Sequence, residues 1–162
     1  MKNYTIQPED TALFWSKVIK TEACWEWGGY KTRGYGRFGF RRINKSVSFS
    51  AHRFSYELAR GEIPDGLVID HACHNRGCVN PEHLRVVTTK QNNENLTRAQ
   101  ARNASGFRGV TWHEPSQAWR ARVGHMGKQY ALGYFKSREA AAEAARLKRL
   151  ELHTHNDLDR AS

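Results

Sequence analysis

The pattern of hydrophobic and polar residues predicts short helices and strands in the first third of the chain. Apolar residues recur near a helical period over residues 10–19, which predicts a short amphipathic helix. Residues 24–49 are rich in aromatic residues and glycine and partly alternate, which predicts antiparallel strands joined by tight turns. One strand should carry aromatic side chains on one face and basic side chains on the other, namely Phe38 and Phe40 opposite Arg37 and Arg41.

A helix and a strand are predicted next, and the strand ends in residues suited to catalysis. Residues 51–60 have apolar side chains at helical spacing, and Gly61 is suited to end that helix. Residues 67–69 form a short apolar run, which predicts a strand with Asp70 and His71 at its end.

A second strand and a polar helix should follow, before a segment of low hydrophobicity. Residues 85–87 suit a strand that returns beside the first, and Thr88 or Thr89 can cap a helix whose first turns hold Asn92. Residues 95–106 contain few apolar residues, which predicts a helical or flexible connector that gives way to a linker.

Three strand-like runs and a final helix are predicted in the last third of the chain. The runs cover residues 107–112, 118–124 and 129–135, and an alanine-rich helix capped by Ser137 should extend to about Leu152. Alternation predicts an apolar face that packs against the helix: Val110, Trp119, Ala121, Val123 and Leu132. The opposite face should present side chains that can read DNA bases: Arg108, Trp112, Arg120, Arg122 and Gln129. The last ten residues are polar and are expected to fray.

The chain is strongly basic, which favours nucleic acid as its partner. Its 162 residues include 26 Lys and Arg against 16 Asp and Glu, for a formal net charge of +10. No apolar stretch suits a membrane helix or a signal peptide, so we expect a cytoplasmic protein with neither a membrane nor a small-molecule substrate as partner. A basic run suits phosphate contacts, although such runs often only keep a protein soluble: Lys31, Arg33, Arg37, Arg41, Arg42 and Lys45.

The three cysteines favour metal binding over a disulfide. Three thiols cannot all pair within one chain, and two of them lie among histidines. Cys73, Cys78 and His83 have the spacing of a tetrahedral zinc site, and Cys24 is expected as the fourth ligand because it is the remaining cysteine. Two histidines stay open as alternatives for that fourth position, His52 and His74. Structural zinc here would connect the N-terminal strands to the loop that follows His71.

A second set of residues has the chemistry of phosphodiester hydrolysis. Neutral His71 can accept a proton from water, while Asn92, with Asp70 as a further candidate, can hold one hard cation such as Mg²⁺ or Mn²⁺ against the phosphate. Taken alone, each residue has an ordinary structural explanation: a hydrogen-bonded histidine at a strand end, and an amide that faces solvent. The combination favours a nuclease.

The motif His71-x-Cys73-x4-Cys78-Val79-Asn80-Pro81-x-His83-Leu84 resembles the ββα-metal nucleases, specifically the HNH and His-Cys-box homing endonucleases of phages and mobile introns. The resemblance covers roughly residues 14–95. It implies the roles given above for the base, the magnesium ligands and the zinc ligands, and it implies that Asn80 orders the loop. It also implies an arginine near the scissile phosphate, for which we choose Arg37, with Arg53 as the substitute.

Residues 105–152 resemble the Apetala/ethylene-responsive-factor-type DNA-binding domain, which places a three-stranded antiparallel sheet in the major groove. The matching segments are Ser105-Gly106-Phe107-Arg108-Gly109-Val110, Trp119-Arg120-Ala121-Arg122-Val123 and Leu132-Gly133-Tyr134-Phe135. Arg108 is the best-matched DNA contact. Thr111 and Ala131 stand where plant members commonly have arginine and tryptophan, so their target sequence does not carry over.

Together these patterns predict an α+β chain of two small domains. Residues 1–97 form a zinc-held ββα-metal nuclease domain, 98–106 a connector, 107–153 a three-stranded antiparallel sheet packed on one helix, and 154–162 a polar tail. The predicted function is site-specific cleavage of double-stranded DNA in a bacterial host, encoded by a phage or mobile element, by a monomer that nicks or a homodimer that cuts both strands. A non-cleaving zinc-stabilised transcriptional regulator is the alternative, and a nuclease that acts on RNA fits less well because the sheet suits B-form DNA.

Overall fold

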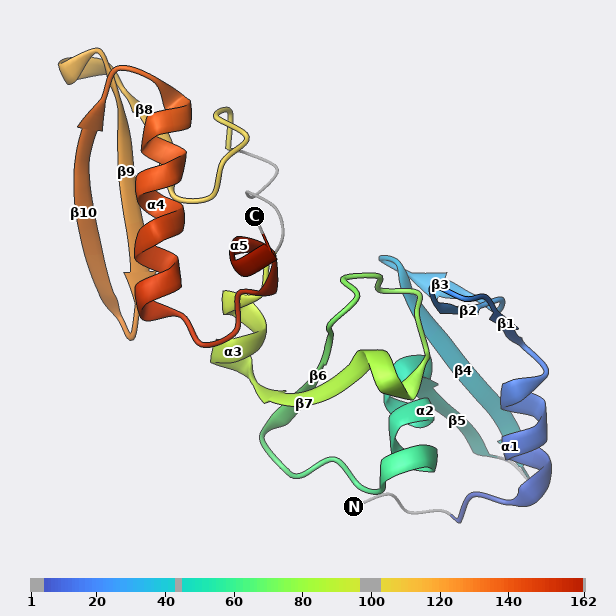
Figure 1. The fold of residues 1–162 in the computed structure, drawn as a ribbon. Coiled ribbons are helices and arrows are strands. Elements are labelled where there is room, and N and C mark those ends of the chain that lie inside the picture. The colour runs from blue at the N-terminus through green and yellow to red at the C-terminus, as the bar shows by residue number, and fades with distance from the viewer. Residues whose placement is uncertain (1–4, 43–44, 97–102, 162) are drawn as a thin grey trace. The chain divides into compact units, whose positions relative to one another are not determined.

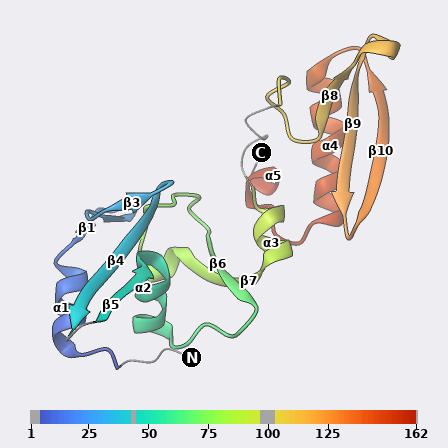
Figure 2. The ribbon, with the colours of Figure 1, turned by 180° about the vertical axis from the view of Figure 1, so that it is seen from behind.

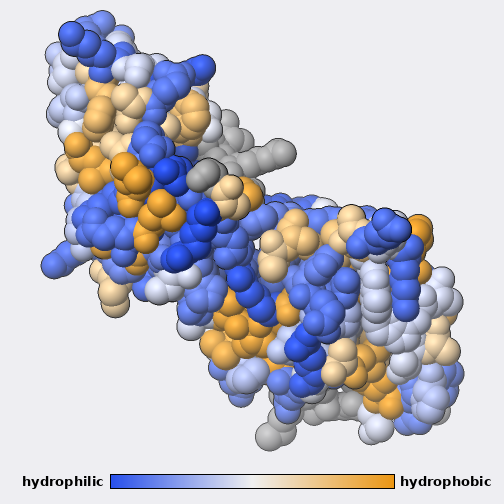
Figure 3. Space-filling model, viewed as in Figure 1, coloured by the Kyte–Doolittle hydropathy of each residue, from blue (hydrophilic) through white to orange (hydrophobic). Residues whose placement is uncertain are grey.

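The computed structural model describes residues 5–42, 45–96 and 103–161, which form two compact units, Met1–Thr88 and Thr89–Ser162. Figures 1 and 2 show small antiparallel sheets and helices in each unit, so the predicted α+β class is confirmed. In the view of Figure 3 the surface of each unit is largely hydrophilic, and its hydrophobic residues form separate small patches. Among the described residues, no helix is long and apolar enough to span a membrane.

Within its described residues, the first unit contains three small sheets and two α-helices. In chain order its elements are α1 (Pro8–Trp15), β1 (Val18–Lys20), β2 (Trp25–Trp27), β3 (Lys31–Thr32), β4 (Tyr35–Arg42), β5 (Lys45–Ser50), α2 (Ala51–Arg60), β6 (Leu67–His71), a 3₁₀ turn (Pro81–His83) and β7 (Leu84–Thr88). The sheets are β1–β2, β3–β4–β5 and β6–β7, and all pairs are antiparallel. The expected helix over residues 51–60, its end at Gly61 and the paired strands around His71 are therefore confirmed.

An aromatic core holds the first unit together. Phe14, Trp27, Phe38 and Phe54 are almost fully buried, and the rings of Phe14 and Trp27 stack with their centroids 5.1 Å apart. Gly36 on β4 allows this packing, because a Cβ atom there would lie 2.6 Å from Cδ1 of Trp27. Burial of Phe38 fixes which face of β4 points inward and leaves Arg37 and Arg41 exposed, as the alternation predicts.

The predicted N-terminal helix over residues 10–19 is wrong in its bounds. The helix begins at Pro8, a residue suited to the first turn, and the Asp10 carboxylate accepts the backbone N–H of Gln7 at 2.9 Å. It ends at Trp15 because the β-branched Val18 and Ile19 pair with β2 as strand β1. Sheet pairing therefore overrides the helical spacing.

The described part of the second unit contains a three-stranded antiparallel sheet and three α-helices. Its elements are α3 (Thr89–Glu94), β8 (Val110–His113), a 3₁₀ turn (Glu114–Ser116), β9 (Ala118–His125), β10 (Lys128–Phe135), α4 (Arg138–Leu152) and α5 (Asp157–Ala161). The sheet order is β10–β9–β8, and α4 covers one face (Figure 2). The core contains Val110, Ala121 and Val123 of the predicted sheet face, packed against Ala141 and Ala145 of α4. Ser137 caps α4 by accepting the N–H of Ala140 at 3.1 Å.

Three local predictions for this unit are corrected. Trp112 does not lie on the face opposite the helix, because its register partner is Trp119 and paired residues of an antiparallel sheet share a face. Residues 103–106 form an ordered turn rather than a linker, with Ser105 buried and its hydroxyl donating to the Val110 carbonyl at 2.8 Å. The expected fraying of the tail is wrong for residues 157–161, which form α5. Most of the predicted connector, up to residue 102, lies outside the described residues.

Candidate active site and metal centre

Four sulfur and nitrogen ligands converge in the first unit, as the sequence predicts. The ligand atoms of Cys24, Cys73, Cys78 and His83 lie within 4.8 Å of one another. Nδ1 of His83 is 3.8 Å from Sγ of Cys24 and 3.6 Å from Sγ of Cys78. These separations are close to the roughly 3.3–3.8 Å between ligand atoms around a tetrahedral ion bound by nitrogen and sulfur. The set therefore fits a metal ion. The fourth member of the group is Cys24, and neither His52 nor His74 belongs to it.

Backbone pairing positions these ligands. Trp27 donates its N–H to the Gly77 carbonyl at 2.9 Å, and Val79 donates to the Trp25 carbonyl at 2.7 Å. Strand β2, which follows Cys24 directly, is thus tied to the loop that carries Cys78. The Ser55 hydroxyl of α2 donates to the Val79 carbonyl at 2.5 Å, so two separate segments of the chain, β2 and α2, hold the same loop.

Asn80 stabilises the turn that carries His83. Its side-chain oxygen accepts the N–H of Glu82 at 3.1 Å and caps the 3₁₀ turn, in agreement with the ordering role that the resemblance implies. The backbone N–H of Asn80 also points to Sγ of Cys78 at 3.4 Å. A thiolate at this position would therefore receive a backbone hydrogen bond.

Burial favours the neutral form of the thiols. Desolvation raises the pKa of Cys78 to about 12 and also raises the pKa of Cys73. A metal ion must therefore release protons from these cysteines when it binds.

His71 is buried at the end of β6, and its surroundings define its tautomer. Nε2 lies 3.1 Å from the carbonyl oxygen of Cys78. Because a carbonyl only accepts hydrogen bonds, Nε2 carries the proton and Nδ1 keeps its lone pair. Burial lowers the pKa of His71 more than the Cys78 carbonyl and the charge of Asp70 raise it, so the ring is neutral at pH 7. A neutral ring with one free nitrogen has the form that a general base requires.

Two aromatic residues that sequence reasoning did not assign to catalysis surround this ring. The centroid of His52 lies 4.8 Å from that of His71, and the Tyr35 ring is 6.0 Å away. Burial, the neighbouring His71 and Arg53 lower the pKa of His52 to about 3, so this second imidazole is also neutral. The sequence suggested His52 only as an alternative metal ligand, because no spacing rule relates residue 52 to residue 71; they meet through tertiary packing.

A basic cleft is lined in part by His52, whose ring neighbours that of His71. It has a volume of about 680 Å³ and is lined by residues of β3, β4, β5, α2 and β6 and of the turn after β3, among them Arg33, Tyr35, Arg37, His52, Arg53 and Ile69. Nη2 of Arg37 donates to the Ser48 hydroxyl at 3.0 Å, and both Arg37 and Arg33 are exposed. Arg41 is exposed on the same strand as Arg37 but does not line this cleft. The structure does not describe the side chains of Arg42 and Lys45, so their predicted phosphate contacts are not tested.

The predicted magnesium ligands fall in different units. Asp70 is buried, and its Oδ2 accepts Nε and Nη2 of Arg85 at 2.9 and 2.8 Å. Any cation held by Asp70 would share the carboxylate with this guanidinium. Asn92 lies in α3, as predicted, which belongs to the second unit. The pairing of Asn92 with His71 therefore stays a prediction.

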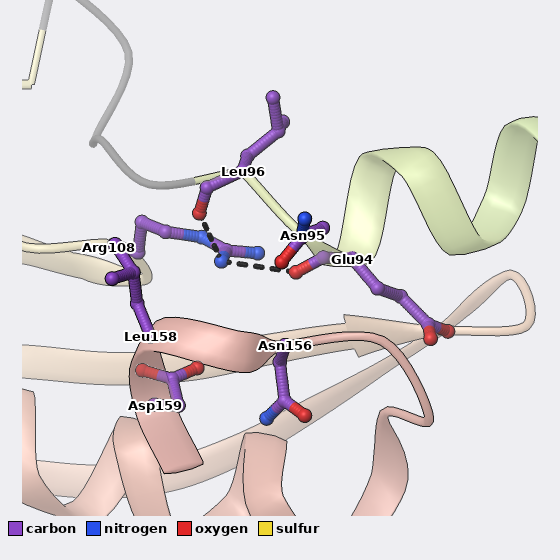
Figure 4. Close-up of a pocket in the computed structure, with 7 residues that line it drawn as sticks. All are labelled: Glu94, Asn95, Leu96, Arg108, Asn156, Leu158 and Asp159. Carbon is purple, nitrogen blue, oxygen red and sulfur yellow. Dashed lines mark hydrogen bonds between the residues drawn. The ribbon is translucent and has the colours of Figure 1, made fainter. Parts of the chain in front are cut away.

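The outer face of the second unit presents most, but not all, of the predicted DNA contacts. Arg122 and Gln129 are exposed and Arg120 is half-buried on the face away from α4, and Tyr134 joins them as the register partner of Arg120. Arg108 is positioned differently, because its guanidinium donates to the backbone carbonyls of Glu94 and Leu96 (Figure 4). Sequence reasoning missed Tyr134, because strict alternation from Leu132 would place it on the face toward α4, whereas the register shift between Ala131 and Gly133 puts it beside Arg120 on the other face.

Comparisons with known proteins place these observations in a family. The chain is 31% identical over 105 residues to Protein 3.8 of Escherichia phage T7, which covers 65% of this chain and 84% of that protein. The chain belongs to the family of this phage protein. Residues 49–94, which include His71 and Asn92, match the family model described as HNH endonuclease, so this chain carries an HNH endonuclease domain there.

Two further phage proteins are similar to parts of the chain. Protein 7.7 of Escherichia phage T7 is 38% identical over 86 residues, which is 52% of this chain and 62% of that protein. The uncharacterized gene 5.3 protein of Enterobacteria phage T3 is 46% identical over 56 residues, 33% of this chain and 55% of that protein. This family member thus spans only 55–62% of the length of several relatives that it matches. No solved structure gives a significant match.

Proposed function

We propose that the chain is a DNA endonuclease of the HNH type in which His71 is the general base. The observation that carries the proposal is the bond from Nε2 of His71 to the Cys78 carbonyl, which leaves Nδ1 able to accept a proton. In the reaction, Nδ1 takes a proton from water, the water oxygen forms a bond to phosphorus, and the bond from phosphorus to the 3′ oxygen breaks. The HNH family match supports this reaction class.

The basic cleft supports the phosphate contacts. Arg37 and Arg53 line it together with His52, whose ring contacts His71. A guanidinium forms bidentate hydrogen bonds with phosphate and offsets the negative charge that develops during attack. We assign Arg37 to this role, with Arg53 as the substitute, and Arg33 and Arg41 to contacts with flanking phosphates.

Metal chemistry completes the proposal. Asn92 and Asp70 are the residues proposed to hold Mg²⁺ or Mn²⁺, which when bound supplies positive charge to the scissile phosphate and the leaving oxygen. The Cys24, Cys73, Cys78 and His83 group is proposed to hold structural Zn²⁺, because three thiolates and one imidazole are a set that zinc favours.

The second unit is proposed to select the DNA site. Arg120, Arg122, Gln129 and Tyr134 share the sheet face away from α4, which suits the major groove of double-stranded DNA. This arrangement supports the proposed likeness to the Apetala-type domain and a site-specific, homing-type enzyme. One active centre in a monomer predicts a nick, whereas a homodimer predicts cleavage of both strands.

Cleavage of supercoiled plasmid tests the assignment. The natural chain, His71→Ala, Asn92→Ala and His74→Asn are compared with and without added Mg²⁺; chelators are avoided because they also strip a zinc site. His74 is the matched control, since it lies three residues from the base and its φ of 56° suits asparagine. We expect the cleavage rate of His71→Ala to be about 10²–10⁴-fold lower than that of the natural chain, with its zinc content unchanged.

The other outcomes are equally informative. Equal cleavage by all four proteins would mean a contaminant or another active centre and would overturn the proposal. DNA binding without cleavage by the natural chain, unaffected by His71→Ala, would identify the non-cleaving regulator instead. Loss of cleavage in His74→Asn with retained zinc would also contradict the assigned role of His71 as the base.

A further inference from the structure

A second group of metal-binding side chains lies in the second unit and is not used by the proposed nuclease. Glu94 ends α3, His125 ends β9 and His153 follows the last residue of α4. Their ligand atoms lie within 4.8 Å of one another, and Oε1 of Glu94 is 3.6 Å from Nδ1 of His125. We propose that Glu94, His125 and His153 form a second metal site that takes Zn²⁺ or a similar divalent transition metal.

The three ligand atoms are buried and aimed at one another. Oε1 of Glu94, Nδ1 of His125 and Nδ1 of His153 have no hydrogen-bond partner among the described residues. Buried polar atoms are rarely left unpaired, because each one costs about 1–3 kcal/mol of desolvation. One cation at their centre would satisfy all three atoms at once.

The remaining atoms of these side chains are already engaged, which orients the free ones. Oε2 of Glu94 accepts the backbone N–H groups of Thr154 and His155 at 3.0 and 3.4 Å. Nε2 of His153 lies 3.3 Å from the Gly124 carbonyl, so it carries the proton and Nδ1 holds a lone pair. Such outer hydrogen bonds hold ligands in place at metal sites and raise their basicity. In Figure 4 the Glu94 carboxylate also extends away from Arg108, which contacts only the backbone carbonyl.

The ionisation states also suit metal binding. Burial would raise the pKa of Glu94, but the Thr154 N–H, the nearby His153 and Lys90 outweigh it, so the pKa is lowered and the carboxylate is charged. Burial lowers the pKa of His153 and keeps its imidazole neutral. A charged carboxylate and a neutral imidazole are forms that bind metal.

The ligand set indicates which metal class binds. Two imidazoles and one carboxylate suit zinc, and three protein ligands leave a fourth position for water or another ligand. The distance of 3.6 Å between Oε1 and Nδ1 is close to the roughly 3.3–3.4 Å expected across a tetrahedral ion with bonds of 2.0–2.1 Å. A cation already faces the carboxylate, since Nζ of Lys90 is 3.4 Å from Oε1, but this side chain is 46% exposed and can turn into solvent.

A metal here would join three separate elements. It would tie the end of α3 to the turn between β9 and β10 and to the C-terminal end of α4. A cavity of about 430 Å³ adjoins the group, lined by Glu94, His125, His153 and Lys128 among others, and gives an ion a route of entry. We therefore expect zinc to stabilise the second unit.

Metal counting tests the proposal on the full chain without a histidine tag. Protein loaded with one equivalent of Zn²⁺ at the cysteine cluster is titrated with more Zn²⁺ by calorimetry, and elemental analysis counts the bound metal. The natural chain should bind one further equivalent and unfold at a higher temperature once it is bound. His125→Gln and His153→Gln should each weaken the second binding event by at least about tenfold.

His113→Gln is the matched control, because His113 is a partly exposed histidine of the same unit that lies outside the group. It should still bind the second equivalent. His125 is the least buried of the three ligands, with 14% of its side chain exposed, so His125→Gln is the variant expected to keep the fold. Its thermal unfolding before zinc is added should match that of the natural chain.

Two results would overturn the proposal. One is a natural chain that binds a single equivalent of zinc in total. The other is a second equivalent that binds with unchanged affinity to a folded His125→Gln protein, which would place that metal elsewhere.

Discussion

Nε2 of His71 lies 3.1 Å from the carbonyl oxygen of Cys78, which joins the candidate general base to a ligand of the cysteine cluster. The bond fixes the ring's tautomer and its orientation at once. The backbone that supplies this carbonyl is held in turn by β2 and α2. The metal-binding loop therefore acts as the support for the proposed catalytic residue.

Cys24→Ser should remove one equivalent of metal and destabilise the first unit. Cys24 precedes β2, and its thiol contributes to the cluster that also holds Cys73 and Cys78. Loss of one ligand weakens metal binding, and structural zinc contributes directly to folding free energy. Elemental analysis and thermal unfolding measure both effects.

His74→Asn and His52→Gln are the controls for this ligand assignment, because both histidines were alternatives for the fourth position. Each should keep its full metal content. Retention of metal by Cys24→Ser, together with its loss from either histidine variant, would show that the assignment of the fourth ligand is wrong.

Arg33→Ala and Arg37→Ala should each weaken DNA binding and lower its salt dependence. Both side chains line the cleft beside His52, and each contact between a basic side chain and phosphate contributes about 0.9 to the slope of log K against log salt concentration. Fluorescence anisotropy at several salt concentrations measures the slope. Lys17→Ala is the control, because Lys17 is exposed but lies outside the cleft; an equal effect in this variant would mean that the cleft is not the DNA site.

Local sequence patterns predicted the elements that depend on near neighbours. The alternation around Phe38, the helix over residues 51–60 and the cap at Ser137 were all correct, because each depends on residues a few positions apart. The cysteine group was also predicted, since three of its four ligands lie within eleven residues and the fourth was the remaining cysteine.

Contacts between distant residues could not be predicted in this way. The His52 and His71 rings meet although 18 residues separate them, and Glu94 meets His125 and His153 across an even longer stretch. Val18 and Ile19 were assigned to a helix because their strand partner, β2, is chosen by tertiary pairing. The placement of Trp112 on the face away from α4 was a different kind of error. Strict alternation along the strand already puts Trp112 on the same face as Val110, which is the face toward α4.

Gly109→Ala should destabilise the second unit more than Gly127→Ala. Both glycines have positive φ angles, 78° and 76°, which cost a side-chain-bearing residue about 1–2 kcal/mol. A Cβ atom at Gly109 would also lie 2.3 Å from the Arg122 carbonyl oxygen, whereas the space at Gly127 is open. We expect an additional loss of about 1–3 kcal/mol at Gly109, measured by urea unfolding. Equal losses at the two positions would contradict the close approach of β9 to Gly109.

Asp159→Asn should strongly destabilise the second unit at neutral pH. The carboxylate forms a two-bond ion pair with Arg149, at 2.6 and 2.8 Å, and the two side chains are only 13% and 9% exposed. Removal of the charge leaves a buried guanidinium without its counter-ion, which typically costs about 3–5 kcal/mol. Glu151→Gln is the control, because its ion pair with Lys148 has an exposed carboxylate and should contribute about 1 kcal/mol or less.

The pH dependence of unfolding distinguishes the ion pair from simple packing. Burial would raise the pKa of Asp159, but the hydrogen bonds and charge of Arg149 outweigh it and lower the pKa below 3.8. The ion pair therefore contributes its full stabilisation above pH 3.8 and loses it as the pH falls through the lower pKa of the folded state. The difference in unfolding free energy between the natural chain and Asp159→Asn should shrink as the pH falls from 5 to 3. Urea unfolding followed through the indole NMR signals of Trp112 and Trp119 reports on this unit alone, and a difference that stays constant over this range would mean that the Asp159 charge does not stabilise the fold.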